Sequence, residues 1–319
     1  KLWFNYDDET TTEDDFLFQS EKTILAHKFT FYTDFLRLSI GELANIYNKS
    51  PSFFDLTPLV IWHNGNQDEF VNVALYFSAE GKAGPVRLFG TYFMDDFDLP
   101  HETHSGKPLA MGFNAGIEYH IFDGKPINSN KFTKKDYTLK EDNLKIQSGL
   151  NVGFEWYHST PMLYNREPDQ APGKFTIPFQ IISLQGENYT FDSDAFFLGF
   201  KYGPNARLFR LYAEYTDNPF EARFAAELLS RGLYNISSTY GDRDKLDEMG
   251  VINMLKIAGA QTTALLLDID FAYYLQESLK LVANVDLQFD FTHKKNVYQI
   301  GIGISCDPFF TDWKNLFSK

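Results

Sequence analysis

The chain has 319 residues, of which 17% are aromatic and 23% are charged, and its formal net charge at pH 7 is -14. This acidity argues against nucleic acid as a partner, because phosphate recognition depends on basic residues. A mean hydropathy of -0.31, together with the lack of any run of about 18 apolar residues, excludes a transmembrane helix from the sequence. The single cysteine, Cys306, excludes an internal disulfide and a cysteine metal cluster.

The N-terminal part of the chain is predicted to contain two strands between loops. No signal-peptide pattern is visible at Lys1, so we expect a mature or trimmed chain in which residues 1–22 are flexible or form a loop. Thr23–Leu43 is apolar and is predicted to hold two short strands. Asn45–Thr57 has a polar start and contains a proline, a pattern typical of a loop.

The rest of the chain contains long segments in which apolar and polar residues alternate. In chain order these segments are Val71–Ala79, Val86–Met94, Met111–Ile121, Leu144–Trp156, Phe209–Tyr215, Leu265–Leu275, Leu279–Phe291 and Tyr298–Cys306. A strand sends alternate side chains to opposite faces, so each segment predicts a strand with one apolar and one polar face. Such strands are longer than the usual globular strand and about long enough to cross a tilted bilayer.

Segment Leu279–Phe291 shows this pattern most clearly. Its apolar parity consists of Leu279, Leu281, Ala283, Val285, Leu287, Phe289 and Phe291, and its other parity contains Lys280, Asn284, Asp286, Gln288 and Asp290, with Val282 as the exception. Aromatic residues lie near the ends of the predicted strands, as in the girdles of membrane barrels. They are Tyr119, Trp156, Tyr215, Tyr273 and Tyr298.

The connections between these strands suggest two different ends of a barrel. Glu80–Pro85 and Gly203–Arg207 are predicted to be tight turns on the periplasmic side. Asp95–Pro108 and Tyr157–Gly173 are predicted to be longer extracellular loops. Ser230–Ala258 is the least barrel-like stretch, and within it Asp242–Ala258 is predicted to form a short helix, in a loop or folded into the lumen.

The predicted fold is all-β. We expect one domain, residues 1–319, that forms an antiparallel transmembrane β-barrel of about 12–18 strands, with loops or short helices filling part of the lumen. A soluble β-sandwich or a lipocalin-like barrel is the alternative, but sandwich strands are shorter and are interrupted by turns more often. The predicted location is the bacterial outer membrane, with its lipid as a partner, and the sequence leaves the oligomeric state open.

The polar parity of the predicted strands gives a set of candidate lumen residues. They are Lys145, Glu155, Arg210, Glu214, Asp268, Asp270, Lys280, Asp286 and Asp290. A salt-bridged network that fills the barrel is the favoured interpretation of these charges. The alternative is a solute-selective pore.

Neither catalysis nor metal binding is favoured by the remaining polar residues. His158 and Ser159 could belong to a barrel acylhydrolase, but neighbours in an extended strand point to opposite faces, so this pair cannot act together there. The acidic cluster Asp95–Asp98, close to His101 and His104, could hold a divalent cation, although solvated acidic loops are more common. We therefore expect a protein without enzymatic activity, bound metal or cofactor.

Several segments, taken in their order along the chain, resemble the capsule-assembly outer-membrane proteins of the Wzi type. They are Leu38–Leu43, Phe54–His63, Asn66–Asn72, Leu88–Phe97 and Leu198–Ala206. This resemblance extends over about a quarter of the chain. It implies a large antiparallel barrel of up to 18 strands that acts as a surface lectin and tethers capsular or other exopolysaccharide.

The predicted function is therefore a non-enzymatic outer-membrane barrel that binds or anchors surface polysaccharide. Aromatic faces together with carboxylate or amide groups typically hold sugars. The candidate ligand-binding residues are Trp62, His63, Asn64, Asn66, Asp95, Asp96, Asp98, Tyr157 and Tyr164. The alternative function is a porin or channel for small solutes.

Overall fold

The structure is a computed structural model that describes residues 2–4, 22–47, 49–57, 70–96, 110–124, 148–165, 179–182, 188–191, 202–235, 238, 256–276 and 279–306. Its strands are β1 (Leu2–Phe4), β2 (Lys22–Tyr32), β3 (Leu36–Tyr47), β4 (Val71–Ala83), β5 (Val86–Asp96), β6 (Ala110–Asp123), β7 (Gly149–Ser159), β8 (Phe179–Ile182), β9 (Asn188–Phe191), β10 (Ala206–Asp217), β11 (Phe220–Arg231), β12 (Thr262–Gln276), β13 (Leu279–Asp290) and β14 (Lys295–Cys306). Among the described residues, no helix is long and apolar enough to cross a membrane.

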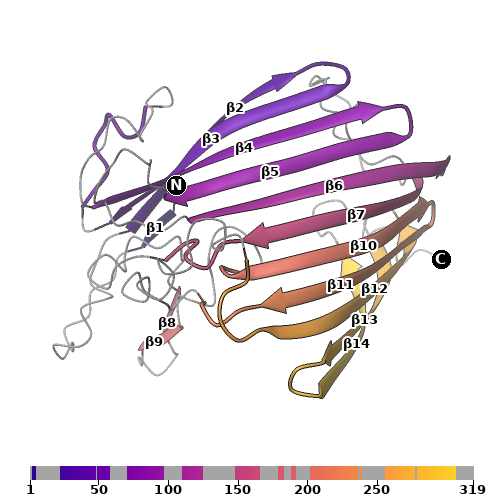
Figure 1. Cartoon of the computed structure of the whole chain (residues 1–319). Helices are drawn as coiled ribbons and strands as arrows, with labels where there is room; N and C mark the ends of the chain where they lie inside the picture. Colours follow the sequence, from indigo (N-terminus) through magenta and orange to yellow (C-terminus); the bar gives the residue numbers. More distant parts are fainter. Residues whose placement is uncertain are drawn as a thin grey trace.

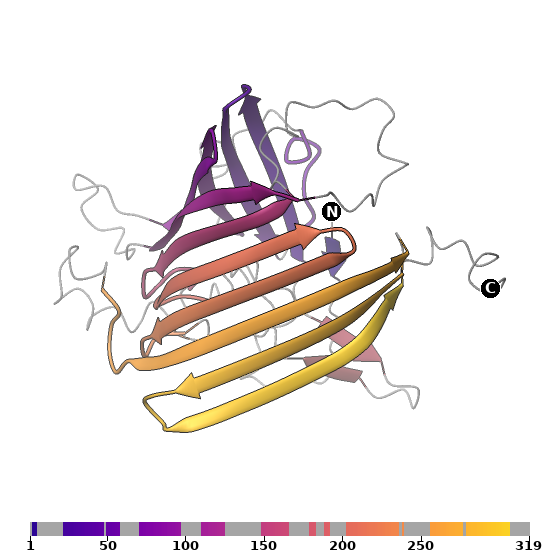
Figure 2. The ribbon, with the colours of Figure 1, turned by 90° about the vertical axis from the view of Figure 1, so that its right-hand side faces the viewer.

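Twelve of these strands form a single antiparallel sheet with up-and-down topology. Its order is β1-β2-β3-β4-β5-β6-β7-β10-β11-β12-β13-β14, and β8 and β9 form a separate pair. The sheet is strongly twisted and curved, as two perpendicular views show (Figures 1 and 2). The predicted all-β antiparallel fold is thus confirmed.

The two ends of the sheet differ in their connections. At one end, here called the hairpin end, short turns join β2 to β3, β4 to β5 and β10 to β11. The turn from β4 to β5 has Gly84 at φ 58 as the first of its two central residues, a position that favours glycine. The opposite end, here called the loop end, is where β3, β5, β7 and β11 finish, and the β13–β14 turn also lies there.

The edges of the sheet are β1 and β14. In the described part of the chain, β14 pairs with β13 and with no other strand, so the sheet is open between β14 and β1. Because β1 runs toward the loop end and β14 runs away from it, the two edge strands are antiparallel. An even number of strands with antiparallel edges is the relation that closure of an up-and-down barrel requires.

Register pairing divides the side chains between two faces. The outer face carries exposed apolar residues at positions that are neighbours across the strands, among them Phe77, Leu88, Ile117, Phe154, Leu211, Phe224, Ile269 and Ile300. The inner face carries charged residues at the intervening positions, among them Arg37, Glu80, Arg87, Glu118, Glu155, Arg210, Glu227 and Asp268. This is the alternation that the sequence predicted.

The N-terminal corner of the sheet departs from this pattern. There the outer-face residues Leu25, Ala44 and Ile46 are buried and form an apolar cluster. The outer-face pair His27 Nε2–Glu42 Oε2, 3.3 Å apart, lies beside this cluster and is also shielded from solvent. The exposed apolar surface therefore begins in the hairpin-end half of β2–β4 and extends to β14.

Some predictions about the elements were wrong. The two strands expected in Thr23–Leu43 are not short, since β2 and β3 have 11 and 12 residues. Strand β11 was not predicted at all. Gly203–Arg207 does not lie on the same side as Glu80–Pro85, because Gly203 precedes β10 at the loop end. Most of Asp242–Ala258 lies outside the described residues.

Candidate functional site

A ladder of ion pairs runs along the inner face from β3 to β6. The Arg37 guanidinium contacts Glu80, and Arg87 Nε lies 2.6 Å from Glu80 Oε1. Arg87 Nη1 also lies 3.3 Å from Glu118 Oε2. Both carboxylates are almost completely buried, which is tolerable because each has a cationic partner.

A glycine extends this ladder past β7. Gly153 lies between Glu118 and Tyr212 in the register, and a Cβ at Gly153 would come 2.3 Å from the Tyr212 ring. Because the position has no side chain, the Tyr212 ring lies across it and its hydroxyl donates to Glu118 Oε2 at 2.9 Å. Glycine thus permits a hydrogen bond between strands that are not neighbours.

A second network surrounds Arg210 of β10. Its Nη1 donates to Glu155 Oε2 at 3.0 Å, and its Nε lies 3.4 Å from Glu227 Oε1. The hydroxyl of Tyr157 donates to Glu155 Oε2 at 2.6 Å, and the hydroxyl of Tyr202 donates to Glu227. Burial and the contact with Glu227 both raise the pKa of the Tyr202 phenol, so it remains a protonated donor.

This second network borders a chamber of about 520 Å³ on the inner face. Three tyrosines, Tyr157, Tyr164 and Tyr202, line the chamber. Its charged lining residues are Arg210, Arg223, Glu227 and Asp268. Aromatic rings combined with charged groups in a cavity of this size are typical of a small-molecule site, for which volumes of roughly 300–1,000 Å³ are usual.

A set of turns covers the inner face at the loop end. This loop-end cap consists of residues 160–165, 203–205, 232–235 and 256–258. Asn205 joins three of these segments, because it exchanges hydrogen bonds with Ala258 at 2.9 and 2.8 Å and accepts one from Gly232 N at 2.9 Å. Leu163 and Tyr164 reach inward and pack against Ala74 on β4. The cap therefore narrows the loop end of the inner space.

A second chamber of about 580 Å³ lies nearer the hairpin end. Arg223 Nε donates to Glu214 Oε1 there at 3.0 Å, and Lys280 Nζ lies 3.8 Å from Glu221 Oε2. These pairs are more exposed than the ladder. Among the described residues, no group of three or more His, Cys, Asp or Glu side chains is arranged to hold a metal ion.

The structure places most of the predicted lumen residues on the inner face. Glu155 and Arg210 form a pair, Glu214 contacts Arg223, and Asp268 lies opposite Asp286 in the register. The inner face also carries Asp270 and Lys280, whereas Asp290 accepts hydrogen bonds from the turn residues Thr292 and His293 at the loop end. Lys145 lies outside the described residues.

Four of the nine predicted ligand-binding residues lie in the described part of the chain, and these four do not form one exposed surface. Trp62, His63, Asn64, Asn66 and Asp98 lie outside the described residues, and Asp96 is described only by its backbone pairing with Ala110. Asp95 is buried. Tyr157 belongs to β7 instead of a loop, and Tyr164 is buried in the loop-end cap against Phe93. Of the four described residues in this set, the two tyrosines come together, at the inner-face chamber.

His158 and Ser159 point to opposite faces, as their spacing predicted. Ser159 Oγ donates to the Gly203 carbonyl at 2.8 Å on the inner side, while the His158 ring packs beside Phe113 on the outer side. The two side chains therefore make no common site. The hydroxyl of Ser159 instead positions the start of β10.

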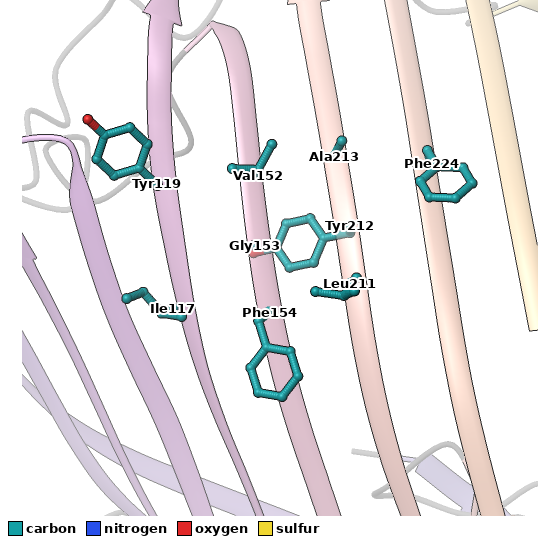
Figure 3. Close-up of a pocket in the computed structure, with 9 residues that line it drawn as sticks. All are labelled: Ile117, Tyr119, Val152, Gly153, Phe154, Leu211, Tyr212, Ala213 and Phe224. Carbon is teal, nitrogen blue, oxygen red and sulfur yellow. The ribbon is translucent and has the colours of Figure 1, made fainter.

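The outer face contains an apolar groove of about 450 Å³ (Figure 3). Its walls come from β6, β7, β10 and β11. The side chains are those of Ile117, Tyr119, Val152, Phe154, Leu211, Ala213 and Phe224, with Gly153 and Tyr212 at its base. The side chains of Val152 and Ala213 are smaller than the others in the wall, and they leave a hollow between the larger side chains.

Several inner-face residues were not singled out from the sequence, namely Glu80, Arg87, Glu118, Tyr212, Arg223 and Glu227. Glu80, Arg87 and Glu118 lie on the polar parity of segments that were predicted as strands, so alternation alone could have identified them. Glu227 and Arg223 lie on β11, which was missed.

The fold belongs to the class of up-and-down antiparallel sheets that have long strands, one apolar face and one charged face.

No family model matches the chain, and no curated protein matches it. Among solved structures, the chain is similar to the NanC porin, with 10% identity, a TM-score of 0.30 and coverage of 90% of this chain and 93% of that one.

Two other solved structures are similar over most of this chain. OmpT of Vibrio cholerae, in a loop-deletion form, shows 9% identity, a TM-score of 0.35 and coverage of 94% of this chain and 70% of that chain. The RagAB peptide importer shows 11% identity, a TM-score of 0.35 and coverage of 89% of this chain but 30% of that chain. At these TM-scores the similarities assign neither a family nor a function.

Proposed function

We propose that the protein is an integral β-barrel of the bacterial outer membrane. The observation that carries this proposal is the outer face of the large sheet, where large apolar side chains are exposed on every strand of β4–β7 and β10–β14. On β14, Ile300, Ile302 and Ile304 are exposed by 73%, 87% and 70%. Apolar patches of this extent are rare on soluble monomers, and they are the normal surface of a barrel in lipid.

Strand length and aromatic placement support the same proposal. The long strands have 11–15 residues, whereas a tilted strand needs about 9–11 residues to cross a bilayer. On the outer face, Tyr119, Tyr215 and Tyr273 lie toward the hairpin end, and Trp156 and Tyr298 lie toward the loop end. Two aromatic rows with an apolar band between them match the girdles of outer-membrane barrels.

Within this barrel, we infer a binding or anchoring role in preference to an open diffusion pore. The loop-end cap narrows the inner space. In the ion-pair ladder the charged side chains pair with one another instead of facing a solute. The resemblance to capsule-assembly proteins makes surface polysaccharide the proposed ligand. The alternative is a channel for small solutes, which the two inner-face chambers favour.

Planar-bilayer conductance separates these two roles. A binding barrel with a narrowed lumen is expected to be nearly silent, whereas stable conductance steps would support the channel and count against anchoring. Polysaccharide binding is tested by pull-down with the double variant Trp62→Ala, Asp96→Ala. Retention of full binding by this variant would argue strongly against the proposed ligand-binding residues.

A further inference from the structure

One carboxylate on the inner face has an oxygen without a hydrogen-bond donor in the described part of the chain. Asp268 of β12 lies between Ala225 of β11 and Asp286 of β13. Its Oδ1 is buried and has no hydrogen-bond partner in the described part of the chain. A buried acceptor without a donor is costly, so such groups in folded proteins commonly face a ligand, an ion or water.

Asp268 has more negative than positive charge around it. Arg210 is already engaged by Glu155 and Glu227, and Arg223 donates through Nε to Glu214. The neighbouring Asp286 accepts a hydrogen bond from Asn284 Nδ2 at 3.0 Å and adds further negative charge. Two guanidinium groups and two carboxylates line the chamber itself. With the adjacent Glu155, Glu214 and Asp286 included, carboxylates outnumber guanidinium groups, which favours a cationic ligand.

Aromatic residues complete the chamber on its other side. Tyr157, Tyr164 and Tyr202 line it together with Asp268. The hydroxyls of Tyr157 and Tyr202 already donate to Glu155 and Glu227, so they are not available to Asp268. The aromatic rings can still attract a cation through their electron-rich faces.

We propose that this chamber binds a small ligand that carries a primary ammonium group, with Asp268 as its carboxylate anchor. An ammonium supplies N–H donors to the Asp268 carboxylate and a positive charge that offsets the surplus of carboxylates around the chamber. The volume of about 520 Å³ suits a single sugar ring or a ligand of similar size. This inference rests on the proposed function in one respect, because the barrel is what encloses the chamber.

The test compares glucosamine with glucose by isothermal titration calorimetry on the full chain in detergent micelles, at a pH where the amine is protonated. The two sugars differ in one substituent, and both are too polar to enter micelles. We expect glucosamine to bind at least about tenfold more tightly than glucose, because a charge-assisted hydrogen bond replaces a neutral one. Equal affinities, or no glucosamine binding, would overturn the proposal.

Asp268→Asn keeps the size of the side chain and removes its charge. It is expected to weaken glucosamine binding by about tenfold. The matched control is Glu221→Gln, which removes a carboxylate from the other chamber and is expected to leave binding unchanged. Equal losses in both variants would reject Asp268 as the anchor. Near-ultraviolet circular dichroism verifies that each variant is folded. If the unaltered chain is a folded, detergent-dependent barrel that does not bind glucosamine, this inference is overturned and the proposed barrel is not.

Discussion

Val285→Arg tests the assignment of the two faces. Val285 lies near the middle of β13 on the outer face, where its register neighbours are Ile269 and Ile300. An arginine near the bilayer midplane costs roughly 2–4 kcal/mol, which lowers the folding equilibrium constant by roughly 30- to 1,000-fold. The variant should therefore unfold at clearly lower urea concentration when it is reconstituted in lipid vesicles.

Two inner-face variants provide the comparison. Gln299→Arg introduces the same side chain directly opposite Asp286, and Asp286→Asn changes the residue next to Val285 in the chain. Both should cost far less than Val285→Arg, because the inner face is polar and a new arginine opposite a carboxylate gains a partner. If Gln299→Arg and Val285→Arg destabilise the protein equally, the faces are misassigned.

Three further changes probe the inner face. Arg210→Met leaves Glu155 and Glu227 buried without their shared cation, so it should lower the free energy of unfolding in a urea titration by about 3–5 kcal/mol. The control is Arg223→Met. The Arg223 side chain is 50% exposed, so this change should cost about 1 kcal/mol or less. Gly153→Ala should cost about 1–3 kcal/mol because its Cβ collides with the Tyr212 ring, while Gly303→Ala, whose Cβ would meet Val282 at 3.6 Å, should be close to neutral in thermal unfolding. Replacing Leu163 by Ala should destabilise by about 2–5 kcal/mol and raise bilayer conductance, because Leu163 fills the loop-end cap; unchanged conductance would show that this cap does not restrict the lumen.

Alternation was sufficient to predict the strands with strong contrast between their faces. In β12, β13 and β14 mostly large apolar residues occupy every second position, so the two-residue repeat of a strand is clear in the sequence. Strand β11 was missed because its sequence, FEARFAAELLSR, is rich in good helix formers and has alanine at outer positions. Its strand state is imposed by pairing with β10 and β12 along its whole length.

The inner-face networks were less predictable than the faces themselves. Parity places Glu155 and Arg210 on one face, but their contact depends on the register between β7 and β10, which alternation does not fix. The bond from Tyr212 to Glu118 skips β7 and exists because residue 153 is a glycine. Tyr157 was expected in a loop because the predicted strand ended at Trp156, three residues before the end of β7.

A nitroxide scan along Leu281–Leu287 of β13 tests the membrane assignment most directly. The scan uses the Cys306→Ser background, so that each introduced cysteine is the only one, in protein reconstituted in lipid vesicles. At the odd-numbered positions we predict frequent collisions with oxygen, which partitions into lipid. At the even-numbered positions we predict preferential contact with a water-soluble nickel chelate. Loss of this alternation, or its reversal, would contradict the claim that the outer face of the sheet contacts acyl chains.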